Sequence, residues 1–128
     1  MNVLIMDDST TMRKIVRKTL RQPGLELGDV HEAGDGYEGL HVIASQPIDV
    51  ILSDINMPNM NGIEFLEKLS ELKLQRPVAI VMITTEGTDD LVQGAMDRGA
   101  GGYVKKPFTP QDVQKAIGAA VRKARAAS

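Results

Sequence analysis

The sequence contains no cysteine and no tryptophan among its 128 residues. Without thiols the chain has no disulfides, no thiolate nucleophile and no zinc–thiolate centre. A chain without cysteine is compatible with a reducing compartment, and we expect a cytoplasmic protein. With 42% apolar residues the chain is long enough for one hydrophobic core and too short for two ordinary domains.

Aromatic residues, excess charge and long apolar runs are also scarce. Aromatic residues make up 3% of the chain, so the core must be aliphatic and a base-stacking platform for single-stranded nucleic acid is not expected. The net charge is −2, which gives no overall attraction to nucleic acid or anionic lipid. The first apolar run, residues 3–6, is too short for a signal peptide or a membrane span. We therefore predict neither nucleic acid nor membrane as a partner.

Residues 50–62 form the stretch around which the chain is organised. The run opens with Val50-Ile51-Leu52, which is typical of a short buried strand, and the strand ends on Asp54. Pro58 and Gly62 then predict a turn before a helical pattern begins at Ile63. Asp54 is thus predicted at the carboxyl end of a strand, where ligands collect in a parallel α/β sheet.

Strand and helix patterns alternate along the whole chain. The predicted strands cover residues 2–6, 30–33, 50–54, 78–83 and 102–105. The predicted helices begin near Met12, Tyr37, Ile63, Asp89 and Pro110. This alternation predicts an α/β fold, a doubly wound, flavodoxin-like sandwich of five parallel strands and five helices. We expect one domain over residues 1–128 with no output domain.

Helix ends are marked by recognisable residues. Predicted N-caps are Ser9 or Thr10, Thr88 and Thr109, while Pro23-Gly24 and Gly99 are predicted to end helices. The first helix is expected to bury Met12, Ile15, Val16, Thr19 and Leu20. The third helix is marked by the apolar residues Ile63, Phe65, Leu66, Leu69 and Leu72.

Five polar residues stand at or just beyond the ends of separate predicted strands: Asp7, Asp8, Asp54, Thr84 and Lys106. Parallel strands would bring all five to one edge of the sheet. Three crowded carboxylates repel one another unless a cation is present, and their hard oxygens suit Mg²⁺, or Mn²⁺, better than zinc. One carboxylate could then act as a nucleophile towards phosphorus, with an ammonium and a hydroxyl holding phosphoryl oxygens.

Each of these residues alone has an ordinary structural explanation. Asp7 and Asp8 could be helix caps, and Asp54 could be a turn former. Thr84 could bond to backbone, and Lys106 could be a solvated charge. The joint placement of the five residues favours a functional site over these explanations.

The motifs resemble those of receiver domains of two-component response regulators, and within that family the CheY-type chemotaxis regulators. The resemblance covers essentially the whole chain. It is carried by Asp7-Asp8, Met12-Arg13-Lys14-Ile15-Val16-Arg17, Asp54 with Asn56-Met57-Pro58-Asn59-Met60-Asn61-Gly62, Thr84 with Glu86, and Gly102-Tyr103-Val104 with Lys106-Pro107-Phe108-Thr109.

The resemblance implies a role for each site residue. Asp54 would be the phospho-acceptor. Asp8 and Asp54 would bind Mg²⁺ through side chains, Asp7 through water and Asn56 through its backbone carbonyl. The remaining roles concern the switch: Thr84 and Tyr103 would move on phosphorylation, and Lys106 would pair with the phosphoryl group. Independently of the resemblance, Pro107 fits a cis peptide that would aim Lys106 inward, although an X-Pro bond is trans by default.

The resemblance also implies partners and a function. A histidine kinase or a small phosphodonor would phosphorylate a monomeric switch that catalyses its own phosphoryl transfer and autodephosphorylation and is not an enzyme in the ordinary sense. The surface of the fourth helix, fifth strand and fifth helix would bind a downstream protein, with the flagellar motor switch protein as the leading candidate and a phosphatase as a further partner. A phosphorelay carrier and a signalling adaptor outside chemotaxis are the alternatives.

Some residues depart from the pattern or weigh against other functions. Ile55, Asn61 and Lys105 differ from the chemotaxis regulators, which leaves the target less certain. Asn56 and Glu86 suggest a short-lived phosphoryl group. An aspartyl-phosphate phosphatase would need a general acid where Asn56 stands. A nucleotide- or flavin-binding domain would need a glycine-rich loop after the first strand, and residues 7–11 contain no glycine.

Overall fold

The structure is a computed structural model that describes residues 1–21, 25–74, 76–85 and 87–126. The predicted end signal Pro23-Gly24 and the predicted site neighbour Glu86 lie outside the described residues. The elements in chain order are β1 (Val3–Met6), α1 (Thr10–Leu20), β2 (Val30–Ala33), α2 (Gly36–Ser45), β3 (Val50–Ser53), α3 (Gly62–Glu71), β4 (Ala79–Thr84), α4 (Asp89–Asp97), β5 (Gly102–Lys105) and α5 (Pro110–Ala126).

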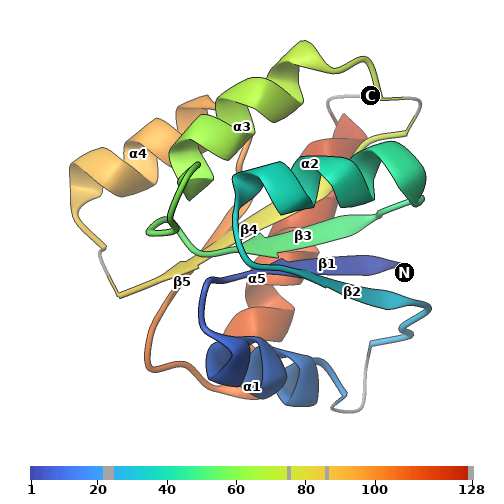
Figure 1. Cartoon of the computed structure of the whole chain (residues 1–128). Helices are drawn as coiled ribbons and strands as arrows, with labels where there is room; N and C mark the ends of the chain where they lie inside the picture. Colours follow the sequence, from blue (N-terminus) through green and yellow to red (C-terminus); the bar gives the residue numbers. More distant parts are fainter. Residues whose placement is uncertain (22–24, 75, 86, 127–128) are drawn as a thin grey trace.

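The strands form one parallel sheet in the order β2-β1-β3-β4-β5 (Figure 1). The chain steps outward from β1 to β2, then crosses back to β3 on the other side of β1. The order therefore reverses between β1 and β3, and a crevice at this reversal point is where doubly wound sheets bind ligands. The predicted flavodoxin-like fold is confirmed.

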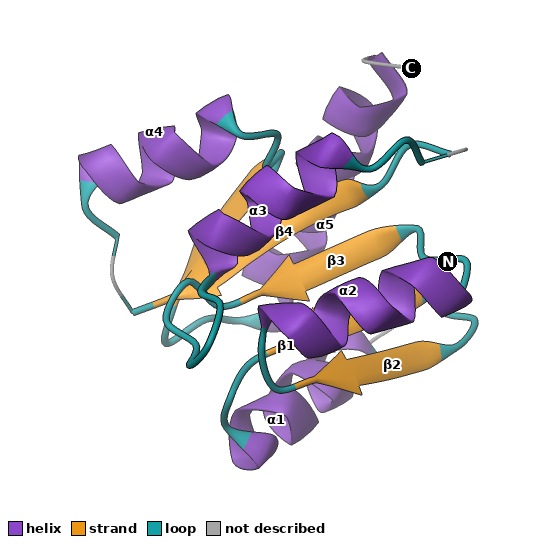
Figure 2. Cartoon of the chain, turned by 45° about the horizontal axis from the view of Figure 1, so that its top comes forward, coloured by secondary structure: helices purple, strands orange, loops and turns teal. Residues whose placement is uncertain are grey.

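Helices cover both faces of the sheet (Figure 2). On one face α2, α3 and α4 enclose a cluster that includes Leu4, Ile51, Phe65 and Met82. On the other face α1 and α5 enclose a second cluster that includes Val16 and Val81 among its buried residues. Aliphatic residues dominate both clusters, as the shortage of aromatic residues predicts. The described residues include no helix long and apolar enough to cross a membrane.

The helices begin where the sequence provides caps. The Ser9 and Thr88 hydroxyls accept N–H bonds from the third residue beyond each, Met12 and Leu91. Thr109 and Asp112 exchange side-chain-to-backbone bonds at the start of α5. These caps satisfy N–H groups that have no partner within the helix.

Two predictions from the apolar patterns of the helices are wrong. Ile15 is 46% exposed because Val16 and Leu20 form the buried stripe of α1, and neighbouring residues point about 100° apart around a helix. Leu72 lies beyond the end of α3, with an extended backbone at ψ 137°, and is 44% exposed. Its N–H donates to the Leu69 carbonyl and so ends the helix.

Candidate functional site

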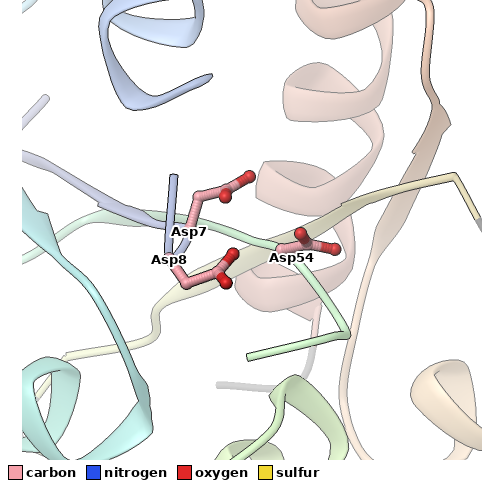
Figure 3. Close-up of side chains that lie close together, drawn as sticks. All are labelled: Asp7, Asp8 and Asp54. Carbon is pink, nitrogen blue, oxygen red and sulfur yellow. The ribbon is translucent and has the colours of Figure 1, made fainter. Parts of the chain in front are cut away.

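Three carboxylates meet at the reversal point of the sheet. Asp7 and Asp8 directly follow β1, and Asp54 directly follows β3, which pairs with β1. One oxygen from each lies within 4.8 Å of the others, and Figure 3 shows the three side chains gathered at this edge. Asp7 and Asp54 are nearly buried, at 4% and 9% exposure, and Asp8 is exposed.

Lys106 bridges two of the three carboxylates. Its Nζ lies 2.9 Å from Asp7 Oδ2 and 3.2 Å from Asp54 Oδ2. A cis peptide joins Lys106 to Pro107, as predicted. Burial by itself would lower the pKa of Lys106, but the hydrogen bonds and charges of the two carboxylates prevail and raise it above its ordinary value. The ammonium is therefore a fixed positive charge at the site.

The Asp54 carboxyl lies in an environment that disfavours its charge. Burial raises its pKa above the ordinary value, and the Asp7 carboxylate adds to the rise, while the Lys106 ammonium opposes it. Asp54 Oδ1 accepts the Ile55 N–H at 2.7 Å, which fixes the orientation of the carboxyl. One ammonium does not neutralise three carboxylates, and their hard oxygens fit Mg²⁺.

Asp7 is held at every polar atom. Its Oδ1 accepts the Ser9 N–H at 2.9 Å, its Oδ2 accepts from Lys106, and its own N–H donates to the Ala33 carbonyl at 3.1 Å. Asp8 is the exposed member of the cluster. The arrangement gives one rigid carboxylate, Asp7, and one accessible to solvent, Asp8.

The loop from β3 to α3 carries Asn56, whose side chain is exposed. This loop is tied to the start of α2, because Asn59 Nδ2 donates to Asp35 Oδ2 at 2.9 Å. The Glu38 backbone N–H and the Asn59 amide lower the pKa of Asp35. Gly62 has no room for a side chain, since a Cβ would lie 2.3 Å from the Asp54 carbonyl oxygen.

The predicted switch residues occupy β4 and β5. Thr84 ends β4, is fully buried, and its carbonyl accepts the Lys106 N–H at 2.9 Å. The Tyr103 hydroxyl is buried without a hydrogen-bond partner among the described residues. It lies against Gly87, where a Cβ would stand 1.9 Å from that oxygen. Thr84 and Tyr103 thus lie on neighbouring strands, with Thr84 at the same sheet edge as the carboxylates.

Sequence reasoning missed the contact of Arg13 with the cluster. Arg13 Nη1 donates to the Asp7 carbonyl at 2.5 Å, and Arg13 Nε pairs with Glu32 Oε1 at 3.0 Å. The sequence offers no signal for this contact, because basic residues are ordinary on the solvent face of a helix. Asp35 and Asn59 were likewise not recognised as a bridge between two loops.

Comparisons with known proteins agree with this geometry. The model of the response regulator receiver domain family matches residues 3–118. A CheY homolog of Campylobacter jejuni is 38% identical over 118 residues, covering 91% of this chain and 89% of the relative. The chemotaxis protein CheY1 of Helicobacter pylori is 39% identical, with 91% and 94% covered.

Solved structures give the same match. The chemotaxis protein CheY4 of Vibrio cholerae superimposes with a TM-score of 0.74 at 37% identity, covering 91% of this chain and 95% of that one. A CheY-like receiver domain protein of Methanospirillum hungatei superimposes with a TM-score of 0.82 at 27% identity, covering 99% and 98%.

Proposed function

The chain belongs to the family of response regulator receiver domains, and we propose that it is a switch set by phosphorylation of Asp54. CheY-like receiver domains are signalling switches and not ordinary enzymes. The observation that carries the proposal is the Lys106 bridge, which ends 3.2 Å from the Asp54 carboxylate inside a cluster of three acids.

Phosphoryl transfer uses the Asp54 carboxylate as nucleophile. One oxygen of Asp54 forms a bond to phosphorus as the bond from phosphorus to the donor imidazole breaks, and the imidazole nitrogen keeps the electron pair and takes a proton. The Lys106 ammonium stabilises the negative charge as it moves from the Asp54 carboxylate to the phosphoryl oxygens. The Thr84 hydroxyl donates to one of those oxygens in the phosphorylated state. The same residues support hydrolysis by water, which resets the switch.

A divalent cation belongs to this proposal. Asp8 and Asp54 would hold Mg²⁺ through carboxylate oxygens, Asn56 would hold it through its backbone carbonyl and Asp7 through water. Mn²⁺ could take its place. The bound cation supplies positive charge that stabilises the transferring phosphoryl group. The support is the donor set, which is entirely oxygen and carries more negative charge than Lys106 offsets.

The output of the switch is protein–protein binding. On phosphorylation the Lys106 ammonium leaves the Asp7 and Asp54 carboxylates and pairs with the phosphoryl group. The hydrogen bond from the Lys106 N–H to the Thr84 carbonyl couples this change to the end of β4. Tyr103 and the surface of α4, β5 and α5 then change their binding to a target. The names of the relatives, which match about nine-tenths of this chain, favour chemotaxis. The proposed donor is a histidine kinase, and the proposed target is a flagellar motor switch protein.

The proposal is tested by intact-protein mass spectrometry after incubation with acetyl phosphate. Wild type, Asp54→Asn and the control Asp29→Asn are compared in Mg²⁺ and in chelator. We expect one phosphoryl group on wild type and Asp29→Asn in Mg²⁺, and none on Asp54→Asn or in chelator. A wild-type protein that stays unmodified with acetyl phosphate and with a phosphorylated histidine kinase would falsify the proposal.

The target is tested separately with a peptide from a flagellar motor switch protein. Phosphorylated wild type should bind the peptide at least about tenfold more tightly than the free form, which corresponds to about 1.4 kcal/mol of differential affinity. Equal affinity of the two forms would exclude this target and leave the acceptor chemistry untouched.

A further inference from the structure

Arg13 ties together three parts of the chain around the acidic cluster. Its Nη1 donates to the Asp7 carbonyl oxygen at 2.5 Å, and its Nη2 donates to Thr10 Oγ1 at 3.2 Å. Its Nε pairs with Glu32 Oε1 on β2 at 3.0 Å. The guanidinium thus uses all three nitrogens, and the side chain is 17% exposed. A planar fork held at three points is a rigid support.

The carbonyl that Arg13 holds belongs to the peptide linking Asp7 to Asp8. A peptide unit is planar, so fixing its oxygen fixes the position of the Asp8 Cα as well. The Asp7 carboxylate is already held by Ser9 and Lys106. Among the described residues the exposed Asp8 side chain has no hydrogen bond or ion pair of its own, so the backbone plane decides where its carboxylate can point.

Arg17 provides a natural comparison within the same helix. Its Nη1 lies 3.4 Å from Glu32 Oε2, so it shares the carboxylate that holds Arg13. Its Nη2, however, donates to the Val30 carbonyl at 2.8 Å, at the start of β2 and away from the cluster. Arg13 and Arg17 thus have the same charge and pair with the same Glu32 carboxylate. They differ in the backbone carbonyl to which each donates.

We propose that Arg13 is a positioning residue that orients Asp8 for the divalent cation, through the Asp7 carbonyl and with Glu32 as its anchor. The inference rests on the proposed metal-dependent function and extends it to a residue outside the ligand set. Arg13 touches neither the acceptor nor the phosphoryl group; it acts through the backbone.

The charge of Arg13 and its positioning of Asp8 predict opposite changes in metal affinity when Arg13 is replaced. A cation next to an acidic site repels a divalent ion, so on charge alone Arg13→Gln would bind the metal more tightly. Positioning predicts the reverse, because Asp8 loses its fixed direction. Partners beyond the direct ligands typically contribute about 10- to 100-fold to metal affinity. The sign of the change in affinity therefore decides between the two.

The experiment measures the Kd for Mn²⁺ from the electron paramagnetic resonance signal of the free ion, without phosphodonor. We expect Arg13→Gln to weaken binding by about tenfold and the control Arg17→Gln to leave it within about twofold. Arg13→Lys keeps the charge but not the three-point fork, and should remain weaker than wild type. Unchanged or tighter binding by Arg13→Gln, or equal weakening by Arg17→Gln, overturns the inference.

A second readout uses the metal-free protein. Hydrogen exchange at the Asp8 and Ser9 amides should be faster in Arg13→Gln than in wild type, and unchanged in Arg17→Gln. Denaturant unfolding gives the stability of each protein, and exchange is compared under conditions of equal stability. Equal exchange in wild type and Arg13→Gln overturns the inference. Failure of wild type itself to bind Mn²⁺ counts instead against the proposed metal-dependent function.

Discussion

The backbone N–H of Lys106 donates to the Thr84 carbonyl at 2.9 Å. This bond joins the end of β4 to the residue after β5. A movement of the backbone at either residue is therefore transmitted to the other. The coupling lies in the backbone, so substitution of the Thr84 side chain does not remove it.

Replacing Lys106 by Met should destabilise the metal-free protein. The Asp7 and Asp54 carboxylates would lose their shared ammonium and face each other at low exposure. Hydrogen bonds to charged groups contribute about 2 kcal/mol each, and we expect a loss of about that size in the free energy of unfolding by urea. Mg²⁺ should reduce the deficit because it supplies the missing positive charge.

The matched control is Lys105→Met, which removes an exposed charge one residue earlier. It should change the free energy of unfolding by less than about 0.5 kcal/mol. Equal losses in the two variants would mean that general surface charge, and not the bridge, stabilises the fold.

Replacing Asp54 by Asn should stabilise the metal-free protein near neutral pH. Burial and the Asp7 carboxylate raise the pKa of Asp54, so folding favours its protonated form. Its contribution to stability is fully present below the ordinary aspartate pKa and is lost as the pH rises through the raised value. The midpoint of thermal unfolding of Asp54→Asn should exceed that of wild type at pH 7.

This difference should disappear in acid. Below a pH of about 3.9 the wild-type carboxyl is protonated in both states and resembles the amide. Asp29→Asn, at an exposed position, serves as the control for loss of a negative charge. A difference that grows as the pH falls would have the wrong sign and would contradict the raised pKa.

Magnesium should stabilise the protein in proportion to its binding. At a free concentration about tenfold above the Kd, linkage gives about 1.4 kcal/mol of added stability. Asp8→Asn should lose most of this gain while unfolding in chelator much as wild type does, since Asp8 is exposed. The measurement is urea unfolding with MgCl₂ or with NaCl of matched ionic strength. A gain that survives in Asp8→Asn would remove Asp8 from the ligand set.

The contact between Gly87 and Tyr103 should appear as an energetic coupling. A Cβ on residue 87 would lie 1.9 Å from the Tyr103 hydroxyl, so Gly87→Ala must push the ring aside. In a Tyr103→Ala background the same substitution should cost far less. A double-mutant cycle on unfolding free energies should give a coupling of about 1–3 kcal/mol.

If the two changes in unfolding free energy were additive, the loop at Gly87 would not confine the Tyr103 ring. The variant Tyr103→Phe provides a further check. Because the hydroxyl has no partner among the described residues, its removal should leave stability within about 0.5 kcal/mol of wild type.

The sequence predicts most of the sheet because the strand signals are local. β2 matches its predicted residues 30–33 and β5 its predicted residues 102–105. The position of Asp54 follows from an apolar run and a turn signal alone. Once the strands are parallel, Asp7, Asp8 and Asp54 must reach one edge, which the structure has.

The remaining details depend on packing that no local pattern encodes. Ile15 is apolar and lies beside the buried stripe, and only the angle at which α1 packs decides that it is exposed. The contact of Arg13 with the Asp7 carbonyl requires α1 to turn back over β1 and β2. The pairing of Asp35 with Asn59 joins loops 24 residues apart in sequence. These contacts are tertiary, and spacing does not reveal them.

The bridge formed by Lys106 also orders events during synthesis of the chain. Asp54 is made 52 residues before Lys106, and Asp7 is made 99 residues before it. At a synthesis rate of about 5–20 residues per second, roughly 3–10 s pass between the addition of Asp54 and the addition of Lys106. A nascent chain therefore carries the Asp54 carboxylate without its counter-charge until Lys106 has emerged and docked against it.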